Sequence, residues 1–305
     1  MGSIAERQVA REISYAHSAR SRAGRIVIRA LENATGRLRL IRRAIGYQDE
    51  VASGTDFWEV MVRRYGLTLD ITGGTLVDIP AGRPVVVVAN HPYGILDGLL
   101  MGHLLSRARG GDFRILAHEV FRKAPDLRDI ILPIDFDQTR AARDLNLKTR
   151  AEALSYLAAG GAIGVFPGGT VSTAARPWSR AMDPLWRAFT ARMIAKSGAT
   201  VVPIFFEGTN SRLFQLASHL HSTLRMGLLI GEFRRRTDTR VRVVIGDRVP
   251  AAEVARNRAD AKALMDFLRA RTYALSPESN CPLDYGLEFE AKYRRADADG
   301  GRDLR

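Results

Sequence analysis

The segment Val85–Ala89 constrains the fold more than any other part of the 305-residue chain, because it is an uninterrupted run of four valines and one alanine. A short apolar and β-branched run of this kind is typical of a strand that is covered on both faces. Similar segments, which we also expect to be strands, lie at residues 67–72, 113–117, 130–134, 162–166, 200–206 and 241–245.

Helical patterns separate these segments. We expect helices at residues 56–65, 99–107, 139–159, 186–197, 213–224 and 259–273, and a further helix near Val120. Strands that alternate with helices predict an α/β fold, in which helices flank a layered sheet with parallel strand pairs.

Positive charge is concentrated near the N-terminus. The whole chain has a formal net charge of +13 and a pI near 10.5. Residues 1–46 alone carry ten arginines and three glutamates, a net charge of +7. Such an excess attracts polyanions, which include anionic lipid, nucleic acid and acidic proteins.

The same segment carries apolar residues at helical spacing. They form one expected stripe, at Val27, Leu31, Ala34, Leu38, Ile41 and Ile45, with arginines on either side. A basic amphipathic helix suits an anionic membrane surface. Packing of the helix on its own domain and binding to nucleic acid are the alternatives, and Gly36 favours a break in the helix.

Composition excludes several classes of protein. The single cysteine, Cys281, excludes an intramolecular disulfide framework and a cysteine-cage zinc site. No apolar stretch is long enough for a membrane-spanning helix, and the N-terminus lacks the apolar core of a secretory signal. We therefore expect a cytoplasmic protein.

The expected parts of the chain are a basic membrane-surface segment at 1–54, a main domain at 55–275 and a partly flexible C-terminal extension at 276–305.

Polar residues that could carry chemistry follow three of the expected strands. His91 comes directly after the valine run, and Asp97 follows it across a turn of proline and glycine. A carboxylate that holds one imidazole nitrogen leaves the other free to accept a proton from a hydroxyl. The alternatives are that Asp97 caps the helix expected near Leu99 and that His91 closes a turn.

The residues that follow the other two strands give a less specific indication of function. The loop after the 162–166 strand offers glycine N–H groups that could face an anion, or it forms only a tight turn. Glu207 follows the 200–206 strand and could be catalytic, although an exposed, solvated side chain is the simpler interpretation. The chain contains no Walker loop, dinucleotide fingerprint, nucleophile elbow or zincin motif.

Three blocks, taken in order, resemble the glycerolipid acyltransferase superfamily of the lysophosphatidate-acyltransferase type. They are Asn90-His91 with Asp97, then Phe166-Pro167-Gly168-Gly169-Thr170, and then Val202-Pro203-Ile204, and the resemblance covers about residues 57 to 250. It implies transfer of a fatty acyl chain from acyl-CoA or acyl carrier protein to the hydroxyl of a lysolipid, without metal or cofactor.

The resemblance also implies roles for particular residues. His91 would be the general base and Asp97 its orienting partner. Substrate would be bound by Asn90 and by the loop residues Phe166, Pro167, Gly168, Gly169 and Thr170. The basic segment would place the protein on an anionic membrane, peripherally on the inner face, and nucleic acid is not an expected partner.

The chain departs from the family pattern at several points. Five residues, rather than four, separate His91 from Asp97, as in the hemolysin-like branch related to ornithine lipids. Gly168 stands where the family has glutamate, and Val171 stands where it has the arginine associated with a glycerol phosphate. Arg176 or Arg180 is the candidate replacement. The competing hypothesis is a non-catalytic lipid-surface binding protein on the same fold.

Overall fold

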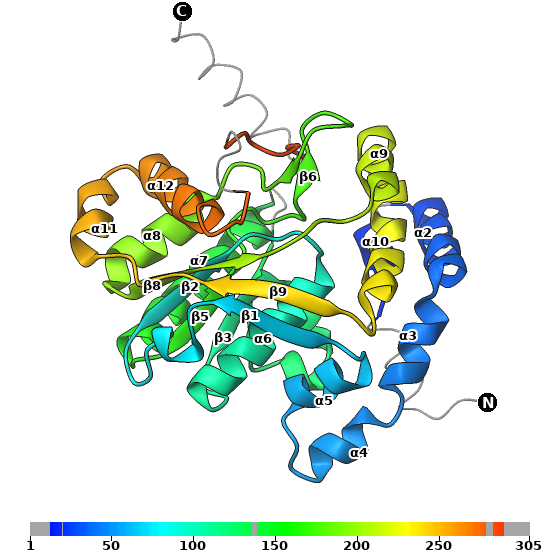
Figure 1. Cartoon of the computed structure of the whole chain (residues 1–305), viewed down its shortest axis with the longest axis horizontal. Helices are drawn as coiled ribbons and strands as arrows, with labels where there is room; N and C mark the ends of the chain where they lie inside the picture. The colour runs from blue at the N-terminus through cyan, green and yellow to red at the C-terminus, as the bar shows by residue number, and fades with distance from the viewer. Residues whose placement is uncertain (1–12, 20, 136–138, 279–282, 290–305) are drawn as a thin grey trace, which may run out of the picture.

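The computed structural model of the chain describes residues 13–19, 21–135, 139–278 and 283–289 (Figure 1). Its centre is a seven-stranded sheet in the order β1-β9-β8-β2-β5-β3-β4. Within this sheet β8 and β9 pair antiparallel, and all other neighbours pair parallel. The strands are β1 (Thr68–Gly73), β2 (Val85–Ala89), β3 (Arg114–His118), β4 (Ile131–Ile134), β5 (Ala162–Val165), β8 (Thr200–Phe206) and β9 (Arg240–Ile245). The expected α/β class is confirmed.

Strand β2 lies in the middle of the sheet, and the prediction from its valine run is confirmed. All five of its residues are fully buried. Alternate side chains point to opposite faces of a strand. Val85 and Val87 accordingly belong to one hydrophobic core, and Val86 and Val88 belong to the other.

Helices cover both faces of the sheet (Figure 1). The core around Val85 and Val87 is completed by α5 (Phe57–Arg64) and α6 (Ile95–Arg109). The core around Val86 and Val88 is completed by side chains of three other helices, namely α7 (Arg140–Ala158), α8 (Ala188–Ser197) and α12 (Ala261–Tyr273). The sheet is therefore the middle of three layers.

One expected helix is two helices in the structure. The pattern at 213–224 predicts a single helix. In the structure α9 (Arg212–Leu220) and α10 (Ser222–Arg236) are separate helices with His221 between them. His221 is extended, with φ −161° and ψ 135°, and its side chain accepts a hydrogen bond from Thr223 N. The apolar pattern continues through this bend, which is why it conceals the change of direction.

The remaining elements are short. The segment near Val120 is a 3-10 turn, η3 (Glu119–Lys123), rather than an α-helix. A small antiparallel hairpin that the sequence did not predict pairs β6 (Thr173–Ala174) with β7 (Ala181–Met182). The others are η1 (Ala16–Ser18), α3 (Arg37–Ala44), α4 (Tyr47–Ala52), η2 (Leu76–Asp78), η4 (Pro125–Leu127) and α11 (Ala251–Asn257).

The arginine-rich part of the N-terminal segment forms two helices, α2 (Arg22–Thr35) and α3, that pack on the domain. Gly36 has φ +118°, which ends α2 and begins α3, so the expected break is confirmed. The expected single stripe is wrong, because the break turns the two helices relative to each other. Its residue Ile41 is buried, whereas Val27 and Leu38 are exposed.

Helix α2 lies against α10 (Figure 1), and glycines on α10 permit a close approach. A Cβ atom at Gly227 would come within 2.7 Å of Leu31, and one at Gly231 within 2.8 Å of Thr35. Among the described residues, no helix has the length and apolar character needed to cross a membrane. Residues 290–305 of the expected C-terminal extension, and Cys281, lie outside the described residues.

Candidate active site

The site begins where β2 ends, because Asn90 joins the central strand to its neighbour β8. The Asn90 side chain donates to the carbonyl of Phe206 at 2.9 Å and accepts from the N–H of Phe206 at 2.7 Å. The backbone of Phe206 thereby satisfies both the nitrogen and the oxygen of the buried Asn90 amide. Asn90 fixes the position from which the next residue, His91, projects.

His91 and Asp97 are brought together. His91 Nδ1 lies 2.9 Å from Asp97 Oδ2, although the contact lacks the alignment of a regular hydrogen bond. The Asp97 side chain is fully buried, whereas 17% of the His91 side chain is exposed. Because Nδ1 faces the carboxylate, Nε2 is the ring nitrogen left for a substrate.

The same carboxylate also orders the turn that separates the two residues. Asp97 Oδ2 accepts hydrogen bonds from Tyr93 N at 2.7 Å and from Gly94 N at 2.9 Å. Helix α6 starts at Ile95, so the expectation of a helix start near Leu99 with Asp97 as its N-cap is wrong. Asp97 is the third residue of the helix, and it binds the turn and His91 together.

Gly94 makes this turn possible. Its φ of +97° and ψ of −122° belong to a region that only glycine adopts readily. Full burial raises the pKa of the Asp97 carboxyl, and the His91 contact and the two backbone N–H groups oppose that rise. The His91 contact and the backbone N–H groups of Tyr93 and Gly94 are thus the groups that favour the ionised form of this buried carboxyl.

The loop after β5 contributes an aromatic ring to the site. Phe166 stacks on His91 with ring centroids 4.3 Å apart and an interplanar angle of 25°. The turn closes with Gly169 N donating to Phe166 O at 3.0 Å, and Gly169 has φ +69°. Pro167 is held by a hydrogen bond from Arg187 N to its carbonyl. The structure thus brings the expected loop against His91.

Gly168 occupies the position at which the family has a glutamate. A Cβ atom there would make ordinary contacts, at 3.4 Å, with Asp183 and Pro184. The local backbone therefore does not require a glycine at Gly168.

Asp183 supports the site and was missed by the sequence analysis. It is fully buried and accepts hydrogen bonds from His91 N, from Trp186 Nε1 at 2.8 Å and from the Ser172 hydroxyl. Ser172 N in turn donates to His91 O at 2.8 Å. The backbone of His91 is therefore held on both sides, and no motif in the sequence marks Asp183 for this role.

Arg225 is the arginine that the structure places on the loop after β5. Its Nη2 donates to Thr170 Oγ1 at 3.1 Å and to Val171 O at 3.0 Å, and its guanidinium lies 4.2 Å over the ring of Phe289. Burial lowers the pKa of Arg225 to about 10. Arg225 belongs to α10, far along the chain from this loop, so the three sequence blocks gave no indication that it contacts Thr170.

The two arginines that the sequence analysis nominated lie elsewhere. Arg176 is exposed in the loop of the β6–β7 hairpin. Arg180 donates to Ser276 Oγ at 2.9 Å and pairs with Glu278. It is Arg225, rather than either of these, that contacts Thr170.

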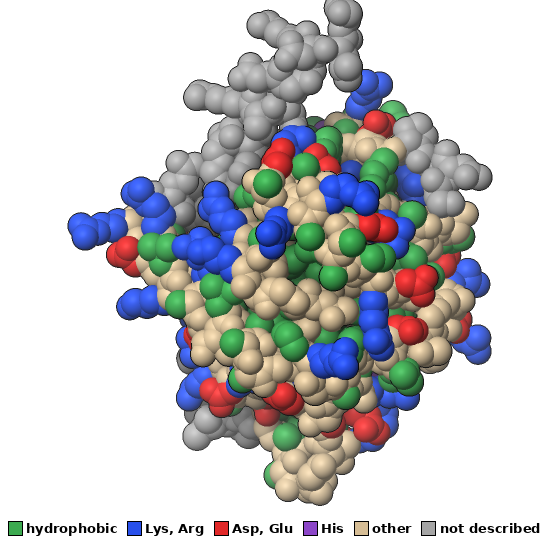
Figure 2. All heavy atoms as spheres, turned by 90° about the vertical axis from the view of Figure 1, so that its left-hand side faces the viewer, with side chains coloured by type: hydrophobic (Ala, Val, Ile, Leu, Met, Phe, Trp, Pro, Cys, Tyr) green, Lys and Arg blue, Asp and Glu red, His purple; other side chains and the backbone are tan. Residues whose placement is uncertain are grey.

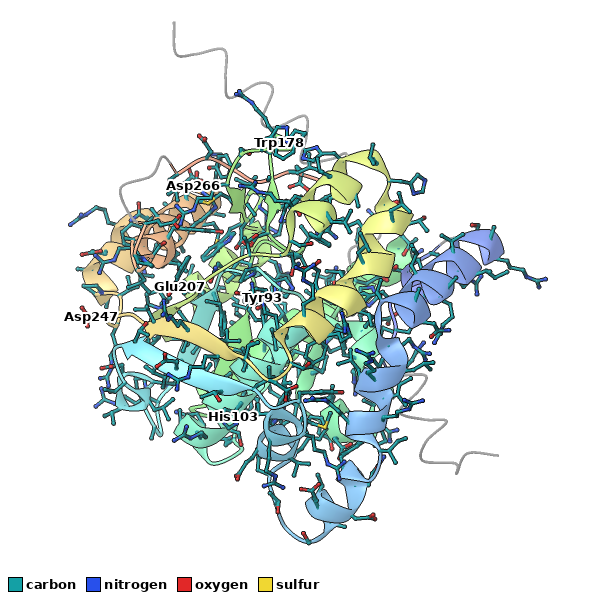
Figure 3. All side chains as sticks on the ribbon, turned by 45° about the vertical axis from the view of Figure 1, so that its right-hand side comes forward. Tyr93, His103, Trp178, Glu207, Asp247 and Asp266 are labelled. Atoms are coloured by element: carbon teal, nitrogen blue, oxygen red, sulfur yellow. The ribbon has the colours of Figure 1, made fainter. Side chains whose placement is uncertain are left out.

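Tyr93 and Glu207 lie near each other (Figure 3), and Tyr15 contacts the same turn. Tyr93 OH donates to the carbonyl of Glu207 at 2.6 Å, while the Glu207 carboxylate pairs with Arg242 at 3.3 Å. From the N-terminal segment, Tyr15 OH accepts a hydrogen bond from Ile95 N at 3.2 Å. The Glu207 side chain, expected to be solvated, is 31% exposed and paired with Arg242.

Comparison with known proteins identifies the class. A family model described as Acyltransferase matches residues 27–281, so the chain belongs to this acyltransferase family. A curated relative, the lyso-glycine lipid O-acyltransferase of Phocaeicola vulgatus, is 27% identical over 161 residues. That match covers 53% of this chain and 54% of the relative, so the chain spans about half the length of this protein.

A solved structure is also similar. The 1-acyl-sn-glycerophosphate (LPA) acyltransferase PlsC from Thermotoga maritima matches with a TM-score of 0.45 and 18% identity. The match covers 88% of this chain and 87% of that one.

Proposed function

We propose that the protein is an O-acyltransferase that moves a fatty acyl chain from acyl-CoA or acyl carrier protein to the hydroxyl of a lysolipid. The observation that carries the proposal is the 2.9 Å contact between His91 Nδ1 and the buried Asp97 carboxylate, at the end of the central strand. With Nδ1 facing the carboxylate, Nε2 is the ring nitrogen in position to accept a proton from a hydroxyl, which supports a general-base role for His91.

The reaction follows from that arrangement. His91 Nε2 removes the proton of the lysolipid hydroxyl as its oxygen attacks the thioester carbonyl. The new C–O bond forms, the C–S bond breaks, and the leaving thiolate takes the proton back from Nε2. Asp97 stabilises the imidazolium that exists between these two transfers, as carboxylates do in catalytic triads.

The surrounding residues take supporting roles in this scheme. Phe166 holds the imidazole plane by stacking, and the loop formed by Phe166, Pro167, Gly168, Gly169 and Thr170 lies beside the acceptor headgroup. Asn90 contributes through the position of His91, since its own amide is bonded to backbone. Positive charge at the protein surface favours an anionic membrane on the inner face of the cell envelope, where lysolipid acceptors are present.

We further propose that the acceptor carries an amino-acid headgroup. Val171 replaces the arginine that the family uses for a glycerol phosphate, and the name of the curated relative specifies a lyso-glycine lipid. Lyso-ornithine lipid and lyso-glycine lipid should therefore be better acceptors than lysophosphatidate.

An acceptor panel tests the proposal. Each of the three lysolipids is offered with palmitoyl-CoA and, separately, with palmitoyl acyl carrier protein, and the acylated product is measured by mass spectrometry. We expect turnover that is highest with the amino-acid lysolipids. Binding to lipid vesicles with no product from any donor and acceptor pair would instead support the non-catalytic lipid-binding hypothesis.

A further inference from the structure

One side of the molecule combines exposed apolar side chains with arginines. Helix α9 presents Leu213 and Leu220 to solvent, with exposures of 62% and 76%. Leu216, partly buried, lies between them at helical spacing, so the three share one face of α9. The described part of the chain therefore leaves most of the Leu213 and Leu220 side chains uncovered.

Trp178 extends this face from the neighbouring hairpin. It is 73% exposed in the loop between β6 and β7 and lies at the edge of the molecule in Figure 3. The hairpin is bonded to α9, because Arg212 Nη1 donates to the carbonyls of Trp178 and Ser179 at 3.4 and 3.2 Å. A second bond joins Ala174 N to the side chain of Gln215 at 2.9 Å.

Helix α2 adds a second group of apolar side chains. Ile26 and Val27 are 70% and 43% exposed. A Cβ atom at Gly24 would lie 3.9 Å from Thr223, so the start of α2 is next to the start of α10, directly after α9. The α9 face, the hairpin loop and the first turns of α2 therefore adjoin one another. We call these three parts the docking face.

Positive charge predominates on the docking face, and the carboxylate of Glu278, which reaches it, is paired with Arg180. The segments 21–31, 175–180 and 212–223 contain six arginines and no aspartate or glutamate. The opposite side of the molecule differs, since Lys and Arg there are interspersed with Asp and Glu (Figure 2). A face of leucine, isoleucine and tryptophan edged by arginines complements the anionic surface of a bilayer, where tryptophan occupies the headgroup level.

We propose that the docking face binds the surface of an anionic lipid bilayer, with Trp178, Leu213 and Leu220 inserted at headgroup depth. Exposed leucine and isoleucine beside tryptophan favour a bilayer over single-stranded nucleic acid, which is bound mainly through basic grooves and base stacking. The hairpin follows directly on the loop that ends at Thr170, so binding here brings the acceptor loop to the membrane. This inference rests on the proposed function only for the source of the acceptor.

Trp178 supplies a specific signal for the test. The chain has three tryptophans, and the other two, Trp58 and Trp186, are buried at 6% and 2% exposure. Vesicles of 30% phosphatidylglycerol and 70% phosphatidylcholine should therefore shift the emission of Trp178 to the blue. Brominated lipid should quench it, and a Trp178→Phe variant should lose both effects.

Vesicle binding by variants completes the test. We expect the double variant Leu213→Gln, Leu220→Gln to bind these vesicles at least tenfold more weakly than the wild type. The matched control is Val77→Gln, Leu147→Gln, which changes two branched apolar side chains, 79% and 53% exposed, in η2 and α7. The control should bind within twofold of the wild type.

Several results would overturn the proposal. They are an unchanged Trp178 emission on addition of vesicles, equal binding by the double variant and the wild type, or a dimer that the leucine changes dissociate in the absence of vesicle binding. Turnover with a water-soluble short-chain acceptor should stay within twofold in the double variant, and its loss would contradict a purely membrane-binding role. The fluorescence and binding results stand even if no acceptor is acylated, so failure of this proposal and failure of the proposed enzyme are separable.

Discussion

Asp183→Asn is the substitution whose effect the structure defines best. The carboxylate accepts three hydrogen bonds, from His91 N at 3.1 Å, from Trp186 Nε1 at 2.8 Å and from the Ser172 hydroxyl. An asparagine has one accepting oxygen, and its NH2 group would face a donor. At least one buried donor would therefore lose its partner.

The expected cost follows from these contacts. Hydrogen bonds to charged groups contribute about 1.5–3 kcal/mol each, and an unsatisfied buried donor costs about 1–3 kcal/mol. We expect Asp183→Asn to lower the free energy of unfolding by about 2–4 kcal/mol, measured by urea denaturation. Acyl transfer should also fall, because the backbone of His91 loses one of its supports.

A double-mutant cycle makes the test specific. Trp186→Phe removes the indole N–H that the new amide would face, and it keeps an aromatic ring in the core. The cost of Asp183→Asn should therefore be smaller, by about 1–2 kcal/mol, in the Trp186→Phe background. A cost below about 0.5 kcal/mol in the wild-type background, or strict additivity of the two changes, would refute the reasoning.

Three further predictions concern the turn around the histidine. Asn90→Ala leaves the N–H and C=O of Phe206 without their partners, so urea unfolding should show a loss of about 2–4 kcal/mol, and a loss under 0.5 kcal/mol would contradict the bridging role. Gly94→Ala should cost about 1–3 kcal/mol from its backbone conformation, whereas the control Gly98→Ala, in the helix with open space around it, should be neutral or stabilising; equal effects of the two would argue against strain at Gly94. Burial raises the pKa of Asp97, so the wild type gains stability from the protonated carboxyl at acid pH and loses it as the pH rises through the raised pKa. Asp97→Asn should therefore become more stable relative to wild type between pH 4 and pH 7, and the opposite trend in urea midpoints would show that the ionised form is favoured.

The parts of the fold that depend on local patterns could be predicted from sequence. The valine run is typical of a strand covered on both faces, and the glycine at position 36 indicated the helix break that the structure contains. The bend at His221 could not be predicted, because both helices that meet there keep an apolar pattern at the same spacing. The prediction of a single apolar stripe in the N-terminal segment was wrong for a related reason, since the break at Gly36 rotates the second helix relative to the first.

The residues of the site also fall into two groups, those with a local signal in the sequence and those without one. His91 and Asp97 are six positions apart, so a single turn brings them together, and the pair was evident from sequence. Asp183 and Arg225 reach the site only through the packing of distant elements, and their positions carry no local signal. Arg176 was nominated because it is close in sequence to the loop, whereas the hairpin carries it to the surface.

The rate of acyl transfer by His91→Ala tests the central claim most directly. The measurement uses saturating donor and the best acceptor of the panel, with circular dichroism to establish that the variant is folded. If His91 is the general base, the rate should fall by about 100-fold to 10,000-fold. A rate within twofold of the wild type would contradict the account.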